Sequence, residues 1–337
     1  MFARPRFSFL IVFLFWFALA GQPAARAQGS GQPLRLVDVH SHILEPQISR
    51  DEEMARFQKG GVGAAAVMSS DPEVLRDLTK RYPGYFIPFV SITREPNGEG
   101  VKLGPDTTVE LKKLLDSGVV CGWGELGTNG SLAVASIDPN DPGAKKDPPA
   151  PQGVRIAAIL LSQNYKKIFE QAAALGAPLN LHLQLEIPEI YEAFSRVAGM
   201  YPRLRLILAH TGWNAAPEPI DKLLREHPNV FADLSMRLEP VNGYTNPSAP
   251  DPEIQRTMLN ADGTLQPAWR KVLETYSDRF MFAMDITTAS RGRADHIGEL
   301  VEVARKALSG LPRGAQEAIG HANFEKLVSG CPAWHPR

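Results

Sequence analysis

Short apolar segments and helical segments alternate along almost the whole chain, and this alternation constrains the fold more than any other feature. Eight segments have the length and the apolar, β-branched composition of buried strands. They span residues 34–44, 63–68, 85–92, 119–126, 178–184, 204–210, 229–235 and 280–285. Strands of this kind are typical of parallel sheets that are covered on both faces.

Helix signals fill the stretches between these strands, for example the N-cap residue Asp71 followed by Pro72. Helices are expected at 49–60, 71–81, 106–117, 163–175, 188–201, 217–226, 267–277, 295–308 and 315–328, and surface loops at 127–151 and 239–265. Eight strand–helix units predict a single parallel (β/α)₈ barrel. A doubly wound open sheet is the alternative, but no glycine-rich phosphate loop follows any of the strands.

The N-terminal segment has the pattern of a secretory signal peptide. Arg4 and Arg6 precede an apolar run at 7–20, and residues 25–27 read Ala-Arg-Ala, a small-x-small cleavage pattern. The run is shorter than the ~20 residues that span a bilayer, which disfavours an uncleaved anchor. We therefore expect cleavage after Ala27, a single domain at 28–337, and a protein exported to the periplasm or secreted, with no membrane contact afterwards.

Composition argues against a nucleic-acid partner. The formal net charge is −1, and removal of 1–27 takes away Arg4, Arg6 and Arg26 and no acidic residue, which leaves −4. A mildly acidic chain without a basic run has no electrostatic surface for nucleic acid. A small-molecule substrate is the expected partner, and the sequence does not indicate an oligomeric state.

Only two cysteines are present, Cys121 and Cys331. An exported protein could join them in a disulfide. Cys121 lies in a strand that is expected to be buried, whereas Cys331 lies in what reads as a surface tail. The sequence therefore predicts two free thiols.

The first strand ends in VDVHSH, residues 37–42. Alternate side chains of a strand point to the same face, so His40 and His42 are expected to project together. Two imidazoles in this arrangement can form half of a metal site, although two polar residues at a strand-to-loop junction are the alternative. Asp38 alternates with His40 and is expected on its face as a partner of a ligand.

Four further candidate ligands stand at the ends of other predicted strands. They are Glu125 on the fourth strand, His182 on the fifth, His210 on the sixth and Asp285 on the eighth. In a barrel these ends meet at one rim, so the side chains are expected to converge. Asp233, on the seventh strand, is expected to support a ligand or to be structural.

Nitrogen and carboxylate ligands without thiolate suit Zn²⁺, Mn²⁺, Fe²⁺ or Co²⁺, and zinc is the ion that we expect, as one or two ions. Such an ion lowers the pKa of a bound water from about 16 to near 7. A neighbouring carboxylate can accept the proton, and Asp285 is our candidate for this general base. Two ions would need a shared ligand, for which Glu125 is the candidate.

Together these residues resemble the metal-dependent amidohydrolase superfamily, and most of all its compact amidohydrolase-related branch. The resemblance is carried by VDVHSH, His182, His210 and Asp285, and by the tail GHANFEKLV, which is similar to the GNA-x-x-L ending with Asn323 at the matching place. It implies a (β/α)₈ fold, a site with one or two metals, and hydrolysis of an ester, lactone, amide or phosphoester.

One departure concerns the fourth strand, where many superfamily members carry a carbamylated lysine. Here the strand has Glu125 within GWGELG, which is similar to the GE[IL]G of phosphotriesterase-like and TatD-like members. Some compact relatives are decarboxylases or hydratases with one metal, which gives one alternative function. A non-catalytic zinc-binding protein is an alternative of another class, but it leaves Asp285 without a role.

Substrate contacts are expected from the loops that follow the strands. The candidates are Trp213, Arg237 and Arg291, and an arginine there could hold a carboxylate or phosphate. An arginine that is solvated or anchors a loop is the alternative.

Overall fold

The computed structural model describes residues 33–44, 47–92, 106–127, 151–239 and 257–335. Residues 33–337 form one compact unit by their internal contacts. The signal segment expected at 1–27, most of the loop expected at 127–151, and residues 240–256 of the second expected loop lie outside the described residues. None of the described helices combines the length and the apolar character that a membrane span requires.

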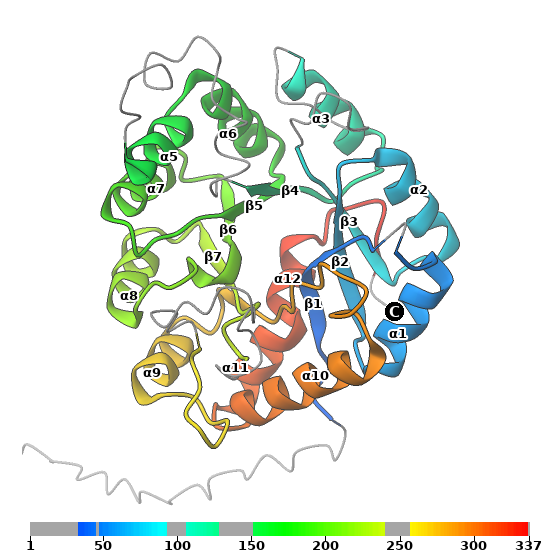
Figure 1. The fold of residues 1–337 in the computed structure, drawn as a ribbon. Helices are drawn as coiled ribbons and strands as arrows, with labels where there is room; N and C mark the ends of the chain where they lie inside the picture. Colours follow the sequence, from blue (N-terminus) through cyan, green and yellow to red (C-terminus); the bar gives the residue numbers. More distant parts are fainter. Residues whose placement is uncertain (1–32, 45–46, 93–105, 128–150, 240–256, 336–337) are drawn as a thin grey trace, which may run out of the picture. The chain divides into compact units, whose positions relative to one another are not determined.

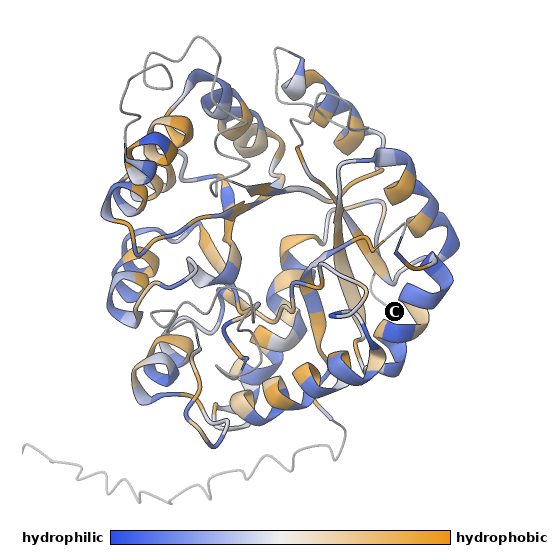
Figure 2. Cartoon of the chain, in the orientation of Figure 1, coloured by the Kyte–Doolittle hydropathy of each residue, from blue (hydrophilic) through white to orange (hydrophobic). Residues whose placement is uncertain are grey.

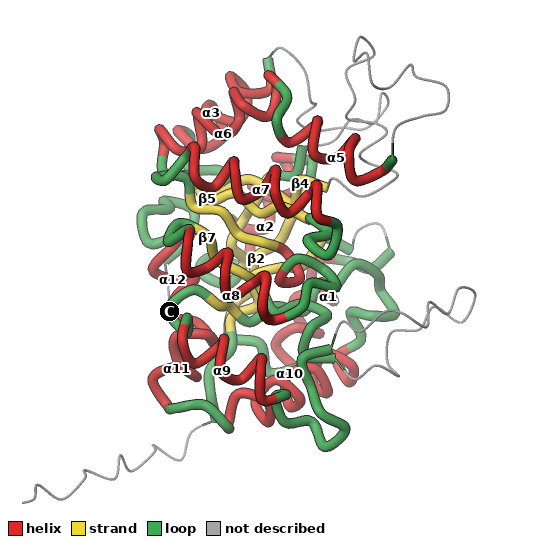
Figure 3. Tube along the Cα trace, turned by 90° about the vertical axis from the view of Figure 1, so that its left-hand side faces the viewer, coloured by secondary structure: helices red, strands yellow, loops and turns green. Residues whose placement is uncertain are grey.

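Eight parallel strands lie side by side in chain order, and helices surround them (Figures 1 and 3). The strands are β1 (Val37–His42), β2 (Ala64–Ser69), β3 (Phe86–Val90), β4 (Gly122–Gly127), β5 (Pro178–His182), β6 (Arg205–Leu208), β7 (Val230–Asp233) and β8 (Phe280–Met281). The segment after β8 closes the sheet onto β1, because Val39 N donates to Phe282 O at 3.1 Å and His42 N donates to Ile286 O at 2.9 Å. The (β/α)₈ barrel that the sequence predicts is confirmed.

The helices cover the outside of the barrel with their apolar faces turned inward (Figure 2). They are α1 (Arg50–Lys59), α2 (Pro72–Arg81), α3 (Thr107–Asp116), α5 (Gln152–Leu160), α6 (Gln163–Leu175), α7 (Pro188–Met200), α8 (Pro217–Glu226), α9 (Pro267–Thr275), α10 (Ala294–Ser309), α11 (Arg313–Glu317) and α12 (Asn323–Leu327). In α8, Ile220, Leu223 and Leu224 are the buried residues, the i, i+3, i+4 spacing of one helical face. Asp71 caps α2 by accepting from Glu73 N at 2.8 Å, as its sequence predicts.

The C-terminal segment closes the N-terminal end of the barrel. A short π-helical turn, η3 (Ala318–Ala322), joins α11 to α12, where the sequence predicts one continuous helix. Phe324 and Leu327 of α12 belong to the same buried cluster as the inward side chains of the strands, such as Val37 and Ala66. Asn323 ties this segment to the barrel, because its amide donates to Ser277 O at 2.7 Å and to Phe280 O at 2.8 Å.

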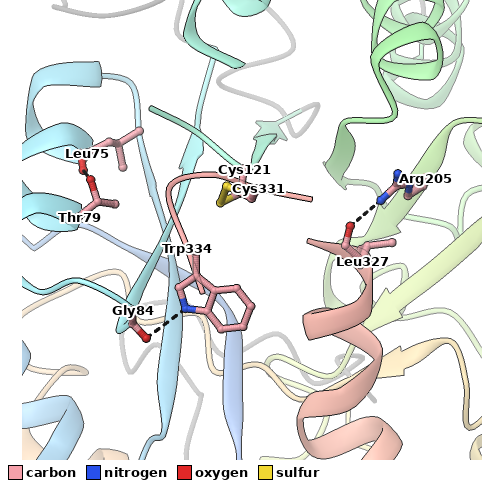
Figure 4. The surroundings of a disulfide bond; sticks show 8 residues. All are labelled: Leu75, Thr79, Gly84, Cys121, Arg205, Leu327, Cys331 and Trp334. Carbon is pink, nitrogen blue, oxygen red and sulfur yellow. Dashed lines mark hydrogen bonds between the residues drawn. A yellow bond between two sulfur atoms is a disulfide. The ribbon is translucent and has the colours of Figure 1, made fainter. Parts of the chain in front are cut away.

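The prediction of two free thiols is wrong. Cys121 and Cys331 form a disulfide, and the chain after α12 brings Cys331 to the start of β4 (Figure 4). The tail is not a surface segment, since Trp334 is buried and its indole N–H donates to Gly84 O at 3.1 Å. Both cysteines therefore lie at the same end of the barrel, 210 residues apart in sequence.

Candidate metal centre

A bulge in β1 sets the direction of the two histidines. Asp38 pairs with Ala65 and Ser41 with Val67, so two residues of β1, Val39 and His40, lie opposite one residue of β2. Ala65 and Val67 pack against the helices, whereas Val39 belongs to the inner cluster. The extra residue therefore turns both Val39 and His40 inward, and His42 follows on the same inner face.

A second bulge, in β4, presents Glu125. Trp123 pairs with Leu179 and Leu126 with Leu181, so the strand again carries one residue more than its neighbour. Gly124 has a φ of 134°, and a Cβ there would lie 2.7 Å from Cβ of Asn180. Only glycine fits this position, which lets the strand bend and directs Glu125 toward the interior.

His182 ends β5, whereas His210 and Asp285 lie beyond the ends of β6 and β8. The sequence predicts strands that run through His210 and Asp285, but β6 ends at Leu208 and β8 at Met281. Both residues have left-handed backbones, with φ of 54° and 55°. The chain turns sharply at each of them, and Asp285 N donates to His40 O at 2.7 Å.

The six predicted ligands converge, and Glu125 lies between two pairs of histidines. Its Oε2 is 3.6 Å from Nε2 of His40 and 3.5 Å from Nε2 of His42. Its Oε1 is 2.6 Å from Nδ1 of His182 and 3.6 Å from Nε2 of His210.

Asp285 joins the first of these histidine pairs. Its Oδ1 is 3.5 Å from Nε2 of His40 and 3.4 Å from Nε2 of His42. The side chain of His42 is 28% exposed, whereas His40 is fully buried, so the cluster opens to solvent on the side of His42.

The sequence predicts Asp38 as the partner of the His40 imidazole, and this prediction is wrong. The bulge turns Asp38 to the outer face, where it accepts from the backbone N–H of His40 at 3.1 Å and of Met284 at 3.0 Å. It holds the backbone of the bulge and does not contact the imidazole. Asp233 does so instead, since its Oδ2 lies 3.0 Å from Nδ1 of His40.

The sequence does not predict two further residues that contact the candidate ligands or Asp233. Ser235 lies 2.7 Å from Nδ1 of His210, and Asn180 donates to Asp233 at 3.4 Å. Ser235 follows Asp233 by two positions, the spacing of one strand face, and this was the available signal.

The three residues predicted to bind substrate differ in their surroundings. The indole of Trp213 packs against His182 and His210, with ring centroids 4.9 and 5.2 Å apart. Arg237 is buried, donates to the backbone oxygens of Trp213 and Ala215, and stacks on Trp269.

Arg291 is also buried, and its guanidinium donates to Met284 O at 2.6 Å, to Asp285 O at 2.7 Å and to the carboxylate of Glu239. These contacts favour the loop-anchoring alternative for both arginines. Trp213 is the candidate that borders the histidines directly.

Charges within the cluster shift its pKa values strongly. Burial alone lowers the pKa of His40, but the nearby carboxylates of Glu125, Asp233 and Asp285 outweigh it and hold that pKa well above its usual value. Burial also opposes protonation of His42, yet Asp285 and Glu125 raise its pKa to about 9.

The carboxylates respond in the opposite direction. Burial favours their neutral forms, but the histidine charges and hydrogen bonds outweigh it, so the pKa of Glu125 lies well below its usual value and that of Asp285 is lowered. For His210, burial and the neighbouring histidine charges lower the pKa. The carboxylates and the imidazoles of His40 and His42 therefore stabilise one another's charged forms, whereas His210 favours its neutral form.

The donor set fits a divalent metal ion. Two groups bring three ligand atoms within 4.8 Å of one another, namely His40, His42 and Asp285, and His40, Glu125 and His210. Nε2 of His40 is buried and has no hydrogen-bond partner among the described residues. A buried imidazole nitrogen without a partner is costly, and coordination of a cation is one way to satisfy it.

Metal affinity should rise with pH up to about 9. Below that pH His42 carries a proton on the metal-free protein, and a cation must displace it, since only neutral imidazole binds metal. We expect zinc affinity, measured against a chelator from about pH 6 to 9, to increase steadily, with proton release detectable by calorimetry in buffers of different ionisation enthalpy. A His42→Asn variant should release fewer protons, and a pH-independent affinity would contradict the prediction.

Comparisons with known proteins bear on the fold and on the family of the chain. No curated protein sequence matches the chain. Among solved structures, an uncharacterised TIM-barrel protein from Bordetella bronchiseptica is similar, with 17% identity, a TM-score of 0.55, and coverage of 88% of this chain and 99% of that one. A zinc-bound amidohydrolase from Burkholderia multivorans has 13% identity, a TM-score of 0.52 and the same coverage.

The TatD homologue YjjV from Escherichia coli K12 has 14% identity and a TM-score of 0.54, and the match covers 87% of this chain and 98% of that one. At these identities the structures show a shared fold. The sequence itself carries the family assignment, because the family model described as Amidohydrolase matches residues 39–329, from β1 through α12. The chain therefore belongs to the amidohydrolase family and is an enzyme of amidohydrolase type.

Proposed function

We propose that the protein is an exported, metal-dependent hydrolase that acts on an ester, lactone, amide or phosphoester. The observation that carries the proposal is the convergence of His40, His42 and Asp285, in which a carboxylate lies beside two imidazole nitrogens. A structural metal site needs no proton-accepting carboxylate beside the side of the cluster that His42 opens to solvent. Hydrolysis by an activated water does.

His40, His42, Glu125, His182, His210 and Asp285 would hold the metal, and zinc is the proposed ion. The zinc-bound relative from Burkholderia multivorans supports this choice. A divalent cation supplies a Lewis acid and makes water more acidic at neutral pH.

Asp285 would accept the proton of the attacking water on its carboxylate and later donate it to the leaving group. The structure holds the backbone of Asp285 in place from two sides, because its N–H donates to His40 O and its carbonyl oxygen accepts from Arg291. Its pKa is lowered, so the carboxylate is ionised at neutral pH, which is the form that can accept a proton. Trp213 would form an apolar wall against the substrate beside His182.

Turnover of a substrate panel tests the proposal. Zinc-loaded and chelator-treated protein are assayed with esters, lactones, amides and phosphoesters, and with unsaturated carboxylic acids, which can lose CO₂ or add water. Metal-dependent hydrolysis of any of the first group supports the proposal. Release of CO₂ alone would favour a decarboxylase, water addition a hydratase, and tight zinc binding without turnover a non-catalytic zinc-binding protein.

We further propose two ions with Glu125 as the shared ligand. Oε2 of Glu125 faces the pair His40 and His42, and Oε1 faces the pair His182 and His210. A carboxylate could offer one oxygen to each of two cations, as in hydrolytic sites with two metals. The competing arrangement is a single ion, because His40 is common to both three-residue groups.

The Glu125→Gln variant should lower metal content. Elemental analysis of wild-type protein is expected to give about two equivalents and of the variant about one or fewer, since an amide cannot bridge two cations with two anionic oxygens. A matched control is Glu274→Gln, whose carboxylate contacts Arg270 on the surface rather than the histidines. One equivalent in both wild type and Glu125→Gln would contradict the two-metal form.

Export is a separate part of the proposal. The disulfide between Cys121 and Cys331 supports an oxidising compartment, where such bonds form and persist. Protein from a secreting host should begin at Gln28 in N-terminal sequencing, because the cleavage pattern ends at Ala27. An Ala27→Asp variant should retain its N-terminal segment. Intact Met1 on wild-type protein in a membrane fraction would show an anchor instead.

A further inference from the structure

Asp233 contacts two of the candidate ligand segments with its two carboxylate oxygens. It is fully buried at the end of β7. Its Oδ2 lies 3.0 Å from Nδ1 of His40, and Asn180 donates to the same oxygen at 3.4 Å. Its Oδ1 accepts from the backbone N–H groups of His210 at 2.9 Å and of Ser235 at 3.1 Å.

These contacts determine which nitrogen of His40 carries a hydrogen. An ionised carboxylate only accepts hydrogen bonds, so Nδ1 of His40 must be the donor. In neutral imidazole the other nitrogen then has a free lone pair. This atom, Nε2, lies 3.5 Å from Asp285 Oδ1 and 3.6 Å from Glu125 Oε2.

Ser235 extends the same constraint to His210. Its hydroxyl contacts both Asp233 Oδ1 and, at 2.7 Å, Nδ1 of His210. The hydroxyl has one hydrogen, and it donates this hydrogen to the carboxylate. The hydroxyl oxygen must therefore accept a hydrogen bond from Nδ1–H of His210. Nε2 of His210 is left with its lone pair toward the site, where it lies 3.2 Å from Nδ1 of His182 and 3.6 Å from Oε1 of Glu125.

We propose that Asp233 is the positioning residue that holds His40 directly, and His210 through Ser235, as Nδ1–H tautomers whose Nε2 atoms face the metal site. Ligand histidines commonly donate their second N–H to a carboxylate. Here one carboxylate holds two histidines, one on β1 and one in the turn after β6, so both candidate ligands depend on the end of β7, which contributes none of the six candidate ligands. The proposal rests on the proposed metal-dependent function.

The Asp233→Asn variant tests the hydrogen bond between Asp233 and His40. The side-chain oxygen can stay toward the N–H groups of His210 and Ser235, which leaves the amide NH₂ toward Nδ1 of His40. The NH₂ group donates, so the hydrogen of His40 moves to Nε2, the atom that faces the metal site. We expect the zinc dissociation constant, measured by competition with a chromophoric chelator, to rise about 10–100-fold.

A double-mutant cycle separates positioning from a structural role. If Asp233 acts through His40, Asp233→Asn should change zinc affinity about 10–100-fold in wild type but very little in a His40→Ala background. A structural residue would change affinity by the same factor in both backgrounds, and that result would overturn the proposal. Ser235→Ala should weaken zinc binding, because it removes the contact with His210 and leaves that with His40. Unchanged zinc affinity in this variant would contradict the positioning of His210 through Ser235.

A measurement on the wild-type protein does not depend on any variant folding. Imidazole ¹⁵N NMR of zinc-loaded protein should show His40 and His210 protonated at Nδ1 and bound through Nε2. Binding of either ring through Nδ1 would overturn the proposal. Absence of zinc binding by wild-type protein would overturn the proposed function as well, whereas normal binding with an unaffected Asp233→Asn variant would overturn only the positioning role.

Discussion

An Asp285→Asn variant should lose turnover by about 10²–10⁴-fold while it keeps most of its zinc. The amide has nearly the shape of the carboxylate and can still bind a cation through its oxygen, but it cannot accept and return a proton. The backbone contacts that hold Asp285, to His40 O and from Arg291, do not involve the carboxylate and should persist. Steady-state kinetics and metal analysis on the same preparation measure the two effects separately.

The matched control is Asp295→Asn, which removes an exposed carboxylate in the first turn of α10. Asp295 pairs with Arg293 on the surface and should leave turnover unchanged. The pH profile gives a further readout, because the limb of the wild-type profile that reports the general base should disappear in Asp285→Asn. Loss of metal in proportion to loss of turnover would show instead that Asp285 is a ligand without a role in proton transfer.

The fold could be predicted from the sequence because its signals are local. Each buried strand is short and apolar, and each following helix repeats apolar residues at one face, as Ile220, Leu223 and Leu224 show. Eight such units leave a barrel as the simplest closed arrangement. The helix Gln152–Leu160 is absent from the expected elements, since it follows directly on a stretch rich in proline and glycine.

The convergence of the candidate ligands could also be predicted, because strand ends of a barrel share one rim. The local geometry could not. A bulge adds one residue to β1 and reverses the face of everything before it, which places Asp38 outside and leaves Asp233 as the partner of His40. Such a bulge is set by pairing with the neighbouring strand, and the alternation of side chains along one strand does not reveal it.

Backbone conformation explains a second difference between the predicted and the observed site, namely where β6 and β8 end. His210 and Asp285 have positive φ values and lie in turns beyond their strands, although apolar residues lead into both. The turn at His210 is held by Asp233, which accepts from its backbone N–H across the sheet. The same long-range dependence applies to Arg237 and Arg291, whose buried carbonyl partners are visible only in three dimensions.

The disulfide between Cys121 and Cys331 is the departure from the sequence prediction with the largest physical consequence. It leads to a second strong prediction. A Cys331→Ser variant should have a free energy of unfolding lower by about 2–5 kcal/mol, because the bond closes a very long loop and so restricts the unfolded chain. The two cysteines are 210 residues apart, and the tail that carries Cys331 also holds Trp334 against Gly84. Denaturant unfolding of the variant and of wild-type protein measures the difference.

Reduction supplies the internal control for this prediction. Wild-type protein unfolded in reductant should match Cys331→Ser, while reductant should have no effect on a Cys121→Ser/Cys331→Ser double variant, which has no thiol left. The double variant should be no less stable than either single variant, because each single change already removes the whole bond. Two titratable thiols in untreated, denatured wild-type protein would contradict the pairing, and equal unfolding midpoints with and without reductant would show that the bond adds nothing to stability. If the expected loss is observed, closure of the barrel by the C-terminal segment depends on an oxidising environment, which is the same condition that the proposed export provides.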